Sequence, residues 1–250
     1  MTHTNEGIIG SPIFNFQEVT STNDVARTFY NQGIAPHGSV IVAAYQANGR
    51  GQQDAVWESK PSENLLFSLV LEPHFLPIDK QVYLNMAVCL AVKQAIQLYV
   101  TKQVSIKWPN DIFIGNKKVA GILIENAINS TYIKMSIVGI GINVSQEVFE
   151  LPKATSLRLV TGKSVGINEV LNRVIDAFIE QYSLLKQNQW DVLMSAYYQC
   201  LYLKDIESTF VVNSATIKGI VKGMDQSGRL MLEVNGNLNY FHNKEIEWLI

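Results

Sequence analysis

The segment QANGRGQQDAVW, which runs from Gln46 to Trp57, contains residue types that can bind an anionic ligand. Gly49 and Gly51 let backbone N–H groups approach an anion closely, and Arg50 can make a forked contact to a carboxylate or phosphate. Trp57 offers an apolar lid. A loop this long and polar is unusual as a mere connection between strands. The pattern favours a loop that wraps a ligand, with an ordinary surface loop as the alternative.

A second group of polar residues lies in KWPNDIFIGNKKVAGILIE, near the ends of two expected strands: Lys107, Asn110, Asp111 and Lys118. A β-hairpin here would bring cations and a carboxylate close together. Lys117 fits a solvated surface position, whereas Lys118 borders an apolar run and is expected to point inward. Gly121 would let a ligand approach the strand closely.

Other kinds of site lack their sequence signals. The glycine pair in VGIGIN, Gly139 and Gly141, has no third glycine of a dinucleotide fingerprint, and no GxxxxGK[ST] motif is present. Cys89 and Cys200 form no CxxC pair, and the four histidines are scattered. We expect reduced, structural thiols and no zinc site.

These candidate residues must be positioned by a mixed β-sheet, because several connections between expected strands are too short for a helix. Strands are expected at 14–19, 39–45, 64–72, 104–108, 111–115, 118–125 and 132–143. Helices are expected from Ser21 or Thr22 to Tyr30, at 79–99, from an N-cap at Asn168, and at 190–200.

After about Asp205 the pattern changes to short alternating runs separated by turns, including DQSG and Asn235-Gly236. This predicts a small β-barrel of about five strands. The predicted fold is α+β, with a mixed-sheet domain in residues 1–204, flanked by helices, and an all-β domain in residues 205–250.

Composition is that of a globular protein, with 47% hydrophobic and 17% charged residues. The formal net charge of -2 gives no reason to expect binding to nucleic acid or an anionic membrane. No signal-peptide pattern and no apolar stretch near the roughly 18 residues of a membrane span is present. We expect a cytoplasmic protein. Edge strands could pair in a homodimer, and the sequence does not decide this.

Taken together, the motifs resemble those of the biotin protein ligases, in the family's order and at compatible spacing. The residues that carry the resemblance are STN from Ser21 to Asn23, YQANGRG, KWPND, KVAGILIE, VGIGINV and the late segment GRLML. The resemblance implies a catalytic domain similar to class II aminoacyl-tRNA synthetases, with an SH3-like terminal barrel. It also implies that biotin and ATP give biotinyl-AMP, and that biotin passes to a lysine of a biotin carboxyl carrier protein.

The resemblance also assigns site residues. It implies a biotin slot formed by Ser21, Thr22, Asn23, Gln46, Gly49, Arg50, Gly51, Trp57 and Gly121. It implies an adenylate site formed by Arg50, Asn110, Lys118, Gly141 and Asn143, with Mg²⁺ near Asn143. Arg50 and Lys118 would offset the repulsion between the biotin carboxylate and the ATP α-phosphate. Asp111 would orient or deprotonate the acceptor lysine, with a turn-capping role as the alternative.

Two features depart from the family pattern. Many relatives have GRGxxG in the loop, whereas Gln52, Gln53 and Asp54 follow Gly51 here. We therefore expect slower loop closure or more leakage of biotinyl-AMP. The first catalytic strand begins near residue 13, which leaves no room for the DNA-binding domain of many bacterial relatives. Direct repression of DNA is not expected.

Two other functions stay open on sequence alone. A lipoate protein ligase performs analogous chemistry on the same general fold, but the GRG loop and KWPND favour biotin. A catalytically silent binding module would fit the altered loop, but Arg50 and Lys118 argue against it.

Overall fold

The computed structural model describes residues 7–52 and 55–249. Gln53 and Asp54, on which the expectation of slow loop closure rests, lie outside these described residues.

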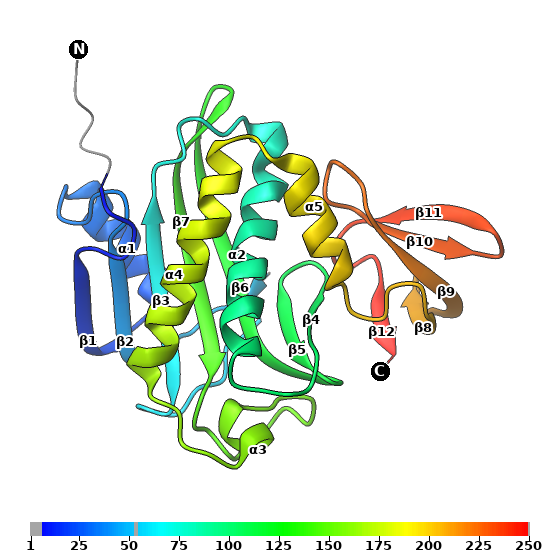
Figure 1. Ribbon diagram of the computed structural model, residues 1–250, viewed down its shortest axis with the longest axis horizontal. Coiled ribbons are helices and arrows are strands. Elements are labelled where there is room, and N and C mark those ends of the chain that lie inside the picture. Colours follow the sequence, from blue (N-terminus) through cyan, green and yellow to red (C-terminus); the bar gives the residue numbers. More distant parts are fainter. Residues whose placement is uncertain (1–6, 53–54, 250) are drawn as a thin grey trace.

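A seven-stranded sheet forms the centre of the larger part of the molecule, in the order β1-β2-β3-β7-β6-β5-β4 (Figure 1). Its strands are β1 Ile13–Val19, β2 Val40–Gln46, β3 Asn64–Leu71, β4 Val104–Lys107, β5 Asp111–Ile114, β6 Lys117–Asn129 and β7 Tyr132–Asn143. β1 and β2 are parallel, and the other neighbours are antiparallel. The mixed sheet expected from the short connections is confirmed.

Helices cover this sheet on both faces. Their bounds are α1 Thr22–Asn31, the 3-10 turn η2 Ile78–Lys80, α2 Gln81–Gln97, α3 Leu157–Thr161, α4 Ile167–Lys186 and α5 Trp190–Gln199. The helices α2, α4 and α5 lie on one face, and α1 lies on the other (Figure 1). Because side chains alternate along a strand, β3 sends Leu65 and Phe67 into the large core and Val70 into the smaller core under α1.

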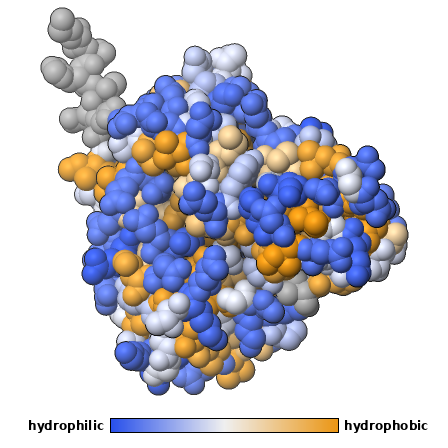
Figure 2. Space-filling model, turned by 45° about the vertical axis from the view of Figure 1, so that its right-hand side comes forward, coloured by the Kyte–Doolittle hydropathy of each residue, from blue (hydrophilic) through white to orange (hydrophobic). Residues whose placement is uncertain are grey.

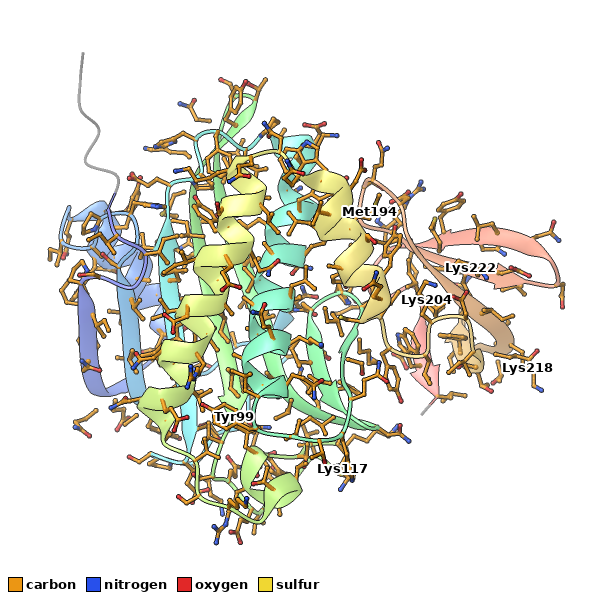
Figure 3. All side chains as sticks on the ribbon, in the orientation of Figure 1. Tyr99, Lys117, Met194, Lys204, Lys218 and Lys222 are labelled. Carbon is orange, nitrogen blue, oxygen red and sulfur yellow. The ribbon has the colours of Figure 1, made fainter. Side chains whose placement is uncertain are left out.

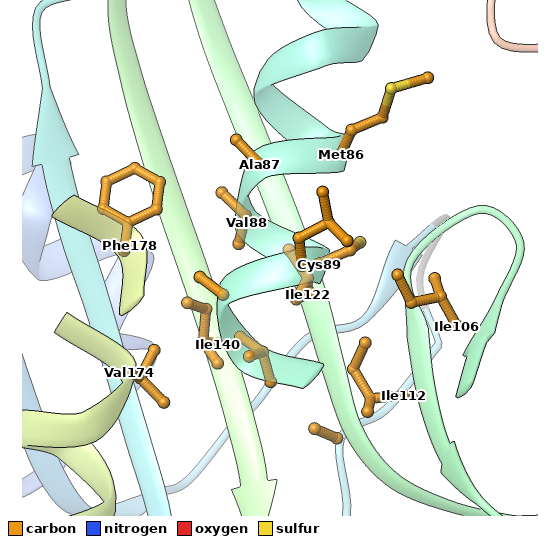
Figure 4. Packing of buried hydrophobic residues seen from close by; sticks show 14 of the residues in the cluster. Met86, Ala87, Val88, Cys89, Ile106, Ile112, Ile122, Ile140, Val174 and Phe178 are labelled. Carbon is orange, nitrogen blue, oxygen red and sulfur yellow. The ribbon is translucent and has the colours of Figure 1, made fainter. Parts of the chain in front are cut away.

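The large core explains why α2 is apolar nearly all round. Its residues Met86, Val88 and Cys89 are buried, and Cys89 lies between the helix and the sheet beside Ile122 (Figure 4). Cys89 and Cys200 are free thiols, as expected. The burial of Cys89 raises the pKa of its thiol far above the ordinary value.

Two details of the helices differ from the expectations. The amphipathic helix α4 is capped by Gly166 rather than by Asn168, because the Gly166 carbonyl already accepts a bond from the Val170 N–H at 3.0 Å. The short helix α3 was not predicted. Its cap is Ser156, whose Oγ accepts from the Leu159 N–H at 3.1 Å.

A second, antiparallel sheet follows the helices, in the order β11-β10-β9-β8-β12. Its strands are β8 Glu207–Val212, β9 Ala215–Met224, β10 Leu230–Val234, β11 Asn237–Phe241 and β12 Glu247–Leu249. Asn235 and Gly236 both have positive φ, as a two-residue hairpin requires. The five strands are confirmed, but the closed barrel is not, because β11 and β12 are the two edges of the sheet. We call this the terminal sheet.

The terminal sheet lies at one side of the molecule (Figure 1). Figure 2 shows hydrophobic residues in this part, ringed by hydrophilic ones. The division of the chain after residue 204 stays a prediction. Within residues 7–52 and 55–249, no helix is long and apolar enough to cross a membrane.

Candidate active site

A cavity of about 390 Å³ lies on the α1 face of the main sheet and extends to the terminal sheet. Its wall contains most of the predicted site residues: Ser21, Thr22, Asn23, Gln46, Arg50, Gly51, Trp57, Asn110, Asp111, Lys118, Gly121 and Gly141. They come from the start of α1, the loop after β2, the β4–β5 corner and the strands β6 and β7. Residues far apart in sequence thus meet at one cavity.

Glycines form the floor of the cavity. Gly121 and Gly141 are cross-strand neighbours, and alternation along both strands directs them to the cavity face. The Trp57 indole ring lies directly on them. A methyl group at Gly141 would come within 2.4 Å of Trp57 Cε2, and one at Gly121 within 2.9 Å of Cζ3. The indole N–H of Trp57 is buried and has no hydrogen-bond partner among the described residues.

Buried polar side chains form one end of the cavity. The Thr22 N–H and hydroxyl both donate to Gln46 Oε1, at 2.7 and 3.0 Å. The Ser68 hydroxyl lies 2.7 Å from Thr22 Oγ1 and 2.6 Å from Asn23 Oδ1, and Asn23 Nδ2 donates to Glu125 at 2.7 Å. Ser68 and Glu125 were not among the predicted site residues. The signal for Ser68 was a lone hydroxyl inside the apolar run LLFSLVL.

Both predicted cations are paired with carboxylates. Arg50 Nη2 lies 2.5 Å from Asp24 Oδ1 and 4.0 Å from Glu125 Oε2. Lys118 Nζ lies 2.6 Å from Asp111 Oδ1 and 5.4 Å from the centroid of the Trp57 ring. The inward orientation predicted for Lys118 is therefore observed. Its approach to Asp111 follows from the hairpin, since Asp111 pairs with Gly121 across the β5–β6 ladder.

A further lysine lies in the cavity wall. Lys107 pairs with Asp111 across the β4–β5 ladder, and its ammonium group lies 5.7 Å from the centroids of both Phe113 and Trp248. Burial lowers the pKa of Lys107. The negative charge of Asp111 acts in the opposite direction and offsets part of this shift. The sequence placed Lys107 in this hairpin without a role.

The β4–β5 corner is held from three sides. The Pro109 carbonyl accepts hydrogen bonds from Asn85 Nδ2 at 2.8 Å and Tyr197 Oη at 3.1 Å. Asn110 Nδ2 donates to the Ile122 carbonyl of β6. Trp108 Nε1 donates to the Gly228 carbonyl of the terminal sheet at 3.0 Å. Asp111 therefore begins β5 from a well-fixed corner.

Gly49 and Asn143 do not line the cavity. A methyl group at Gly49 would come 3.2 Å from both Gln46 Nε2 and the Trp57 carbonyl, so Gly49 packs behind the wall. Asn143 is buried and donates to the Thr155 carbonyl at 2.9 Å, whereas its Oδ1 has no partner among the described residues. No group of three His, Cys, Asp or Glu residues within the described ranges could hold a metal ion.

The terminal sheet contributes to the wall of the cavity. Asn243, Lys244, Ile246, Glu247 and Trp248 line the cavity. Asn243 Nδ2 also donates to Gln52 Oε1 of the segment 46–57, here called the glycine loop. The turn from Asp225 to Leu230 is not among the residues that line the cavity, and its Gly228 carbonyl contacts Trp108. No motif in the sequence marked the segment 243–248.

Comparison with known proteins identifies the family. Residues 14–143 match the Biotin/lipoate A/B protein ligase family. The chain is 30% identical to the Bifunctional ligase/repressor BirA of Bacillus subtilis, over 96% of this chain and 75% of that protein. It is 25% identical to the Biotin--[acetyl-CoA-carboxylase] ligase of Mycobacterium tuberculosis, over 80% of this chain and 74% of that protein.

A solved structure agrees with this match. The biotin protein ligase from Aquifex aeolicus in complex with biotin and ATP superposes with a TM-score of 0.80 at 25% identity, covering 95% of this chain and 98% of that one. The chain belongs to the biotin/lipoate protein ligase family. It is a ligase.

Proposed function

We propose that this protein is a biotin protein ligase that forms biotinyl-AMP from biotin and ATP and transfers biotin to a lysine of a biotin carboxyl carrier protein. The observation that carries the proposal is the convergence of a buried polar end, a glycine floor and two cations on one cavity. The polar end, with Thr22, Asn23 and Gln46, suits the ureido group of biotin. The cations suit the two anions that must react.

In the first step, a biotin carboxylate oxygen attacks the ATP α-phosphorus, and the bond to the β-phosphate oxygen breaks to release pyrophosphate. Negative charge gathers at the α-phosphate, so a fixed cation there lowers the barrier. Lys118 is the candidate, because it lies beside the glycine floor. Arg50 binds the carboxylate or phosphate once the ligand has replaced Asp24 as the partner of its guanidinium group.

Asn143 is the candidate to hold a magnesium ion that arrives with ATP. Asn143 has a buried Oδ1 with no partner among the described residues, and it lies two positions after Gly141 of the glycine floor on β7. Mg²⁺ is commonly held by one or two carboxylates together with substrate phosphates and water, so a full protein cage is not needed. When bound, Mg²⁺ would supply charge neutralisation at the phosphates.

In the second step, the acceptor amine attacks the acyl carbon of biotinyl-AMP, and the bond to the phosphate oxygen breaks to release AMP. An unperturbed lysine has a pKa of about 10.4 and is almost wholly protonated at neutral pH. Asp111 is the candidate to receive its proton. While Lys118 is paired with Asp111, the Asp111 carboxylate is not available as a base. A phosphate that attracts Lys118 would release this carboxylate.

The finer predictions from the sequence are part of this proposal. They are the class II synthetase-like catalytic domain, the SH3-like barrel, the carrier protein as partner, a possible homodimer and a cytoplasmic location.

The test is ATP/pyrophosphate exchange with biotin and, in parallel, with lipoate. We expect exchange that depends on biotin, and mass spectrometry of a carrier domain incubated with the protein, biotin and MgATP should show one added biotinyl group. Exchange with lipoate alone would replace the proposal with a lipoate ligase. No exchange with either acid would contradict adenylation.

A further inference from the structure

A single carboxylate connects two segments, one that directly follows Trp57 of the cavity wall and one that contacts the backbone of Lys118. The segment 58–64 follows the glycine loop, and the segment 145–156, here called the clamp loop, connects β7 to α3. The Glu58 carboxylate accepts from the Glu150 N–H at 3.0 and 3.1 Å and from the Leu151 N–H at 3.4 Å. Glu58 thus satisfies two backbone donors of the clamp loop.

A buried amide pair reinforces this connection. Gln146 is fully buried, and its Nε2 donates to Glu58 Oε1 at 3.2 Å. Its Oε1 accepts from Asn64 Nδ2 at 2.6 Å and from the Lys60 N–H at 3.1 Å. Asn64 Oδ1 in turn accepts from the Val144 N–H at 3.1 Å. A buried polar group that loses its hydrogen-bond partner destabilises the fold. These hydrogen bonds therefore hold the two segments in one arrangement.

The far end of the clamp loop contacts the backbone of Lys118. The Lys118 N–H donates to the Lys153 carbonyl at 2.8 Å, and the Lys118 carbonyl accepts from the Thr155 N–H at 2.9 Å. The Thr155 carbonyl accepts from Asn143 Nδ2 at 2.9 Å. Both main-chain polar groups of Lys118 therefore depend on the position of the clamp loop.

We propose that Glu58 is a positioning residue, which orients Lys118 and Asn143 through the clamp loop. This inference rests on the proposed function, since it concerns the placement of Lys118 in adenylation. Reacting groups must be held within about half an ångström of the productive geometry. Glu58 does not contact the polar end of the cavity, so it acts on adenylation and not on biotin binding.

Two substitutions and one control test the proposal. Glu58→Ala should lower kcat for biotin-dependent pyrophosphate exchange about tenfold, because several hydrogen bonds to a charged group are lost. The KM for biotin should stay the same. Glu58→Gln should recover part of kcat, because one amide oxygen can still accept from Glu150. Glu147→Gln is the matched control, because Glu147 lies in the same loop but pairs with Arg158 at its exposed side.

Hydrogen exchange supplies a readout that does not depend on activity. In Glu58→Ala, the amides of Lys118 and Thr155 should lose protection together with those of Glu150 and Leu151, while Glu147→Gln leaves them unchanged. The proposal is overturned if Lys118 and Thr155 keep their protection. It is also overturned if kcat per folded molecule is unchanged, or if only the KM for biotin rises. Failure of the wild-type protein to catalyse exchange would overturn the proposed function instead.

Discussion

At the residue scale, both predicted cations of the candidate site are paired with a carboxylate. Arg50 is paired with Asp24, and Lys118 with Asp111. These side chains are partly exposed, so such pairs contribute little to stability. Their consequence is functional, because an arriving anion competes with a carboxylate for each cation.

Replacement of Lys118 tests the role of the inward cation. Lys118→Gln should lower biotin-dependent pyrophosphate exchange on the order of a hundredfold, since it removes one fixed charge at the developing negative charge. Lys117→Gln is the control, because Lys117 is exposed near the end of the β5–β6 hairpin (Figure 3). Equal losses in the two variants would argue that general charge matters rather than position.

Replacement of Asp111 separates the two steps. Asp111→Asn keeps the size of the side chain but cannot take up a proton. Transfer from preformed biotinyl-AMP to a carrier domain should slow on the order of a hundredfold, the usual range for a lost general base. Single-turnover measurements would follow this step alone. Unchanged transfer would show that Asp111 serves only as the partner of Lys118.

At the scale of elements, the β4–β5 corner depends on helices from the opposite face of the sheet. Asn85 of α2 and Tyr197 of α5 both donate to the Pro109 carbonyl. Tyr197 is fully buried, and this burial raises the pKa of its hydroxyl well above the ordinary value, so the group stays a donor. The large core thereby fixes a corner of the cavity.

The Tyr197→Phe variant tests this connection. It should lose about 1 kcal/mol of unfolding free energy, as for one hydrogen bond. It should also lose severalfold in kcat at a temperature where it is fully folded, since Asp111 follows the corner directly. Tyr99→Phe is the control, because Tyr99 Oη donates to Glu169 of α4 at 3.1 Å, away from the cavity (Figure 3). A stable variant with wild-type kcat would contradict the link.

At the scale of the whole molecule, the terminal sheet completes the cavity of the main sheet. It supplies the segment 243–248 to the wall and holds Trp108 through Gly228. The turn before Gly228 is organised by Asp225. Asp225 Oδ1 accepts from the N–H groups of Ser227 and Arg229, and Oδ2 lies 2.6 Å from Arg229 Nη2.

The pH dependence of this turn gives a further prediction. Burial alone would raise the pKa of Asp225, but the bonds from Ser227 and Arg229 outweigh it and hold the pKa below its usual 3.8. A carboxylate with a depressed pKa contributes stability above its unfolded pKa and loses it as pH falls through the folded value. Asp225→Asn should therefore cost about 1 kcal/mol near neutral pH. Denaturant titrations should show this difference shrinking below about pH 4, the unfolded value for Asp, and a constant difference would contradict the assignment.

Local patterns in the sequence determined much of this protein. Alternation in VGIGIN and KVAGILIE predicted strands β7 and β6, and the motif order pointed to the family that the comparisons identify. Residue type and short-range spacing suffice for these features. Strand periodicity and the space that a glycine leaves beside the backbone are local properties. The inward direction of Lys118 also followed from its position beside an apolar run.

The tertiary structure alone decided which residues meet. Ser68 and Glu125 contact Asn23 of the cavity wall, and the segment 243–248 reaches the cavity, only because β3, β6 and the terminal sheet are brought together by pairing and packing over long sequence separations. The partner of Arg50 and the connection from Glu58 to the clamp loop have the same origin. Such contacts depend on three-dimensional register, for which no local pattern provides a signal.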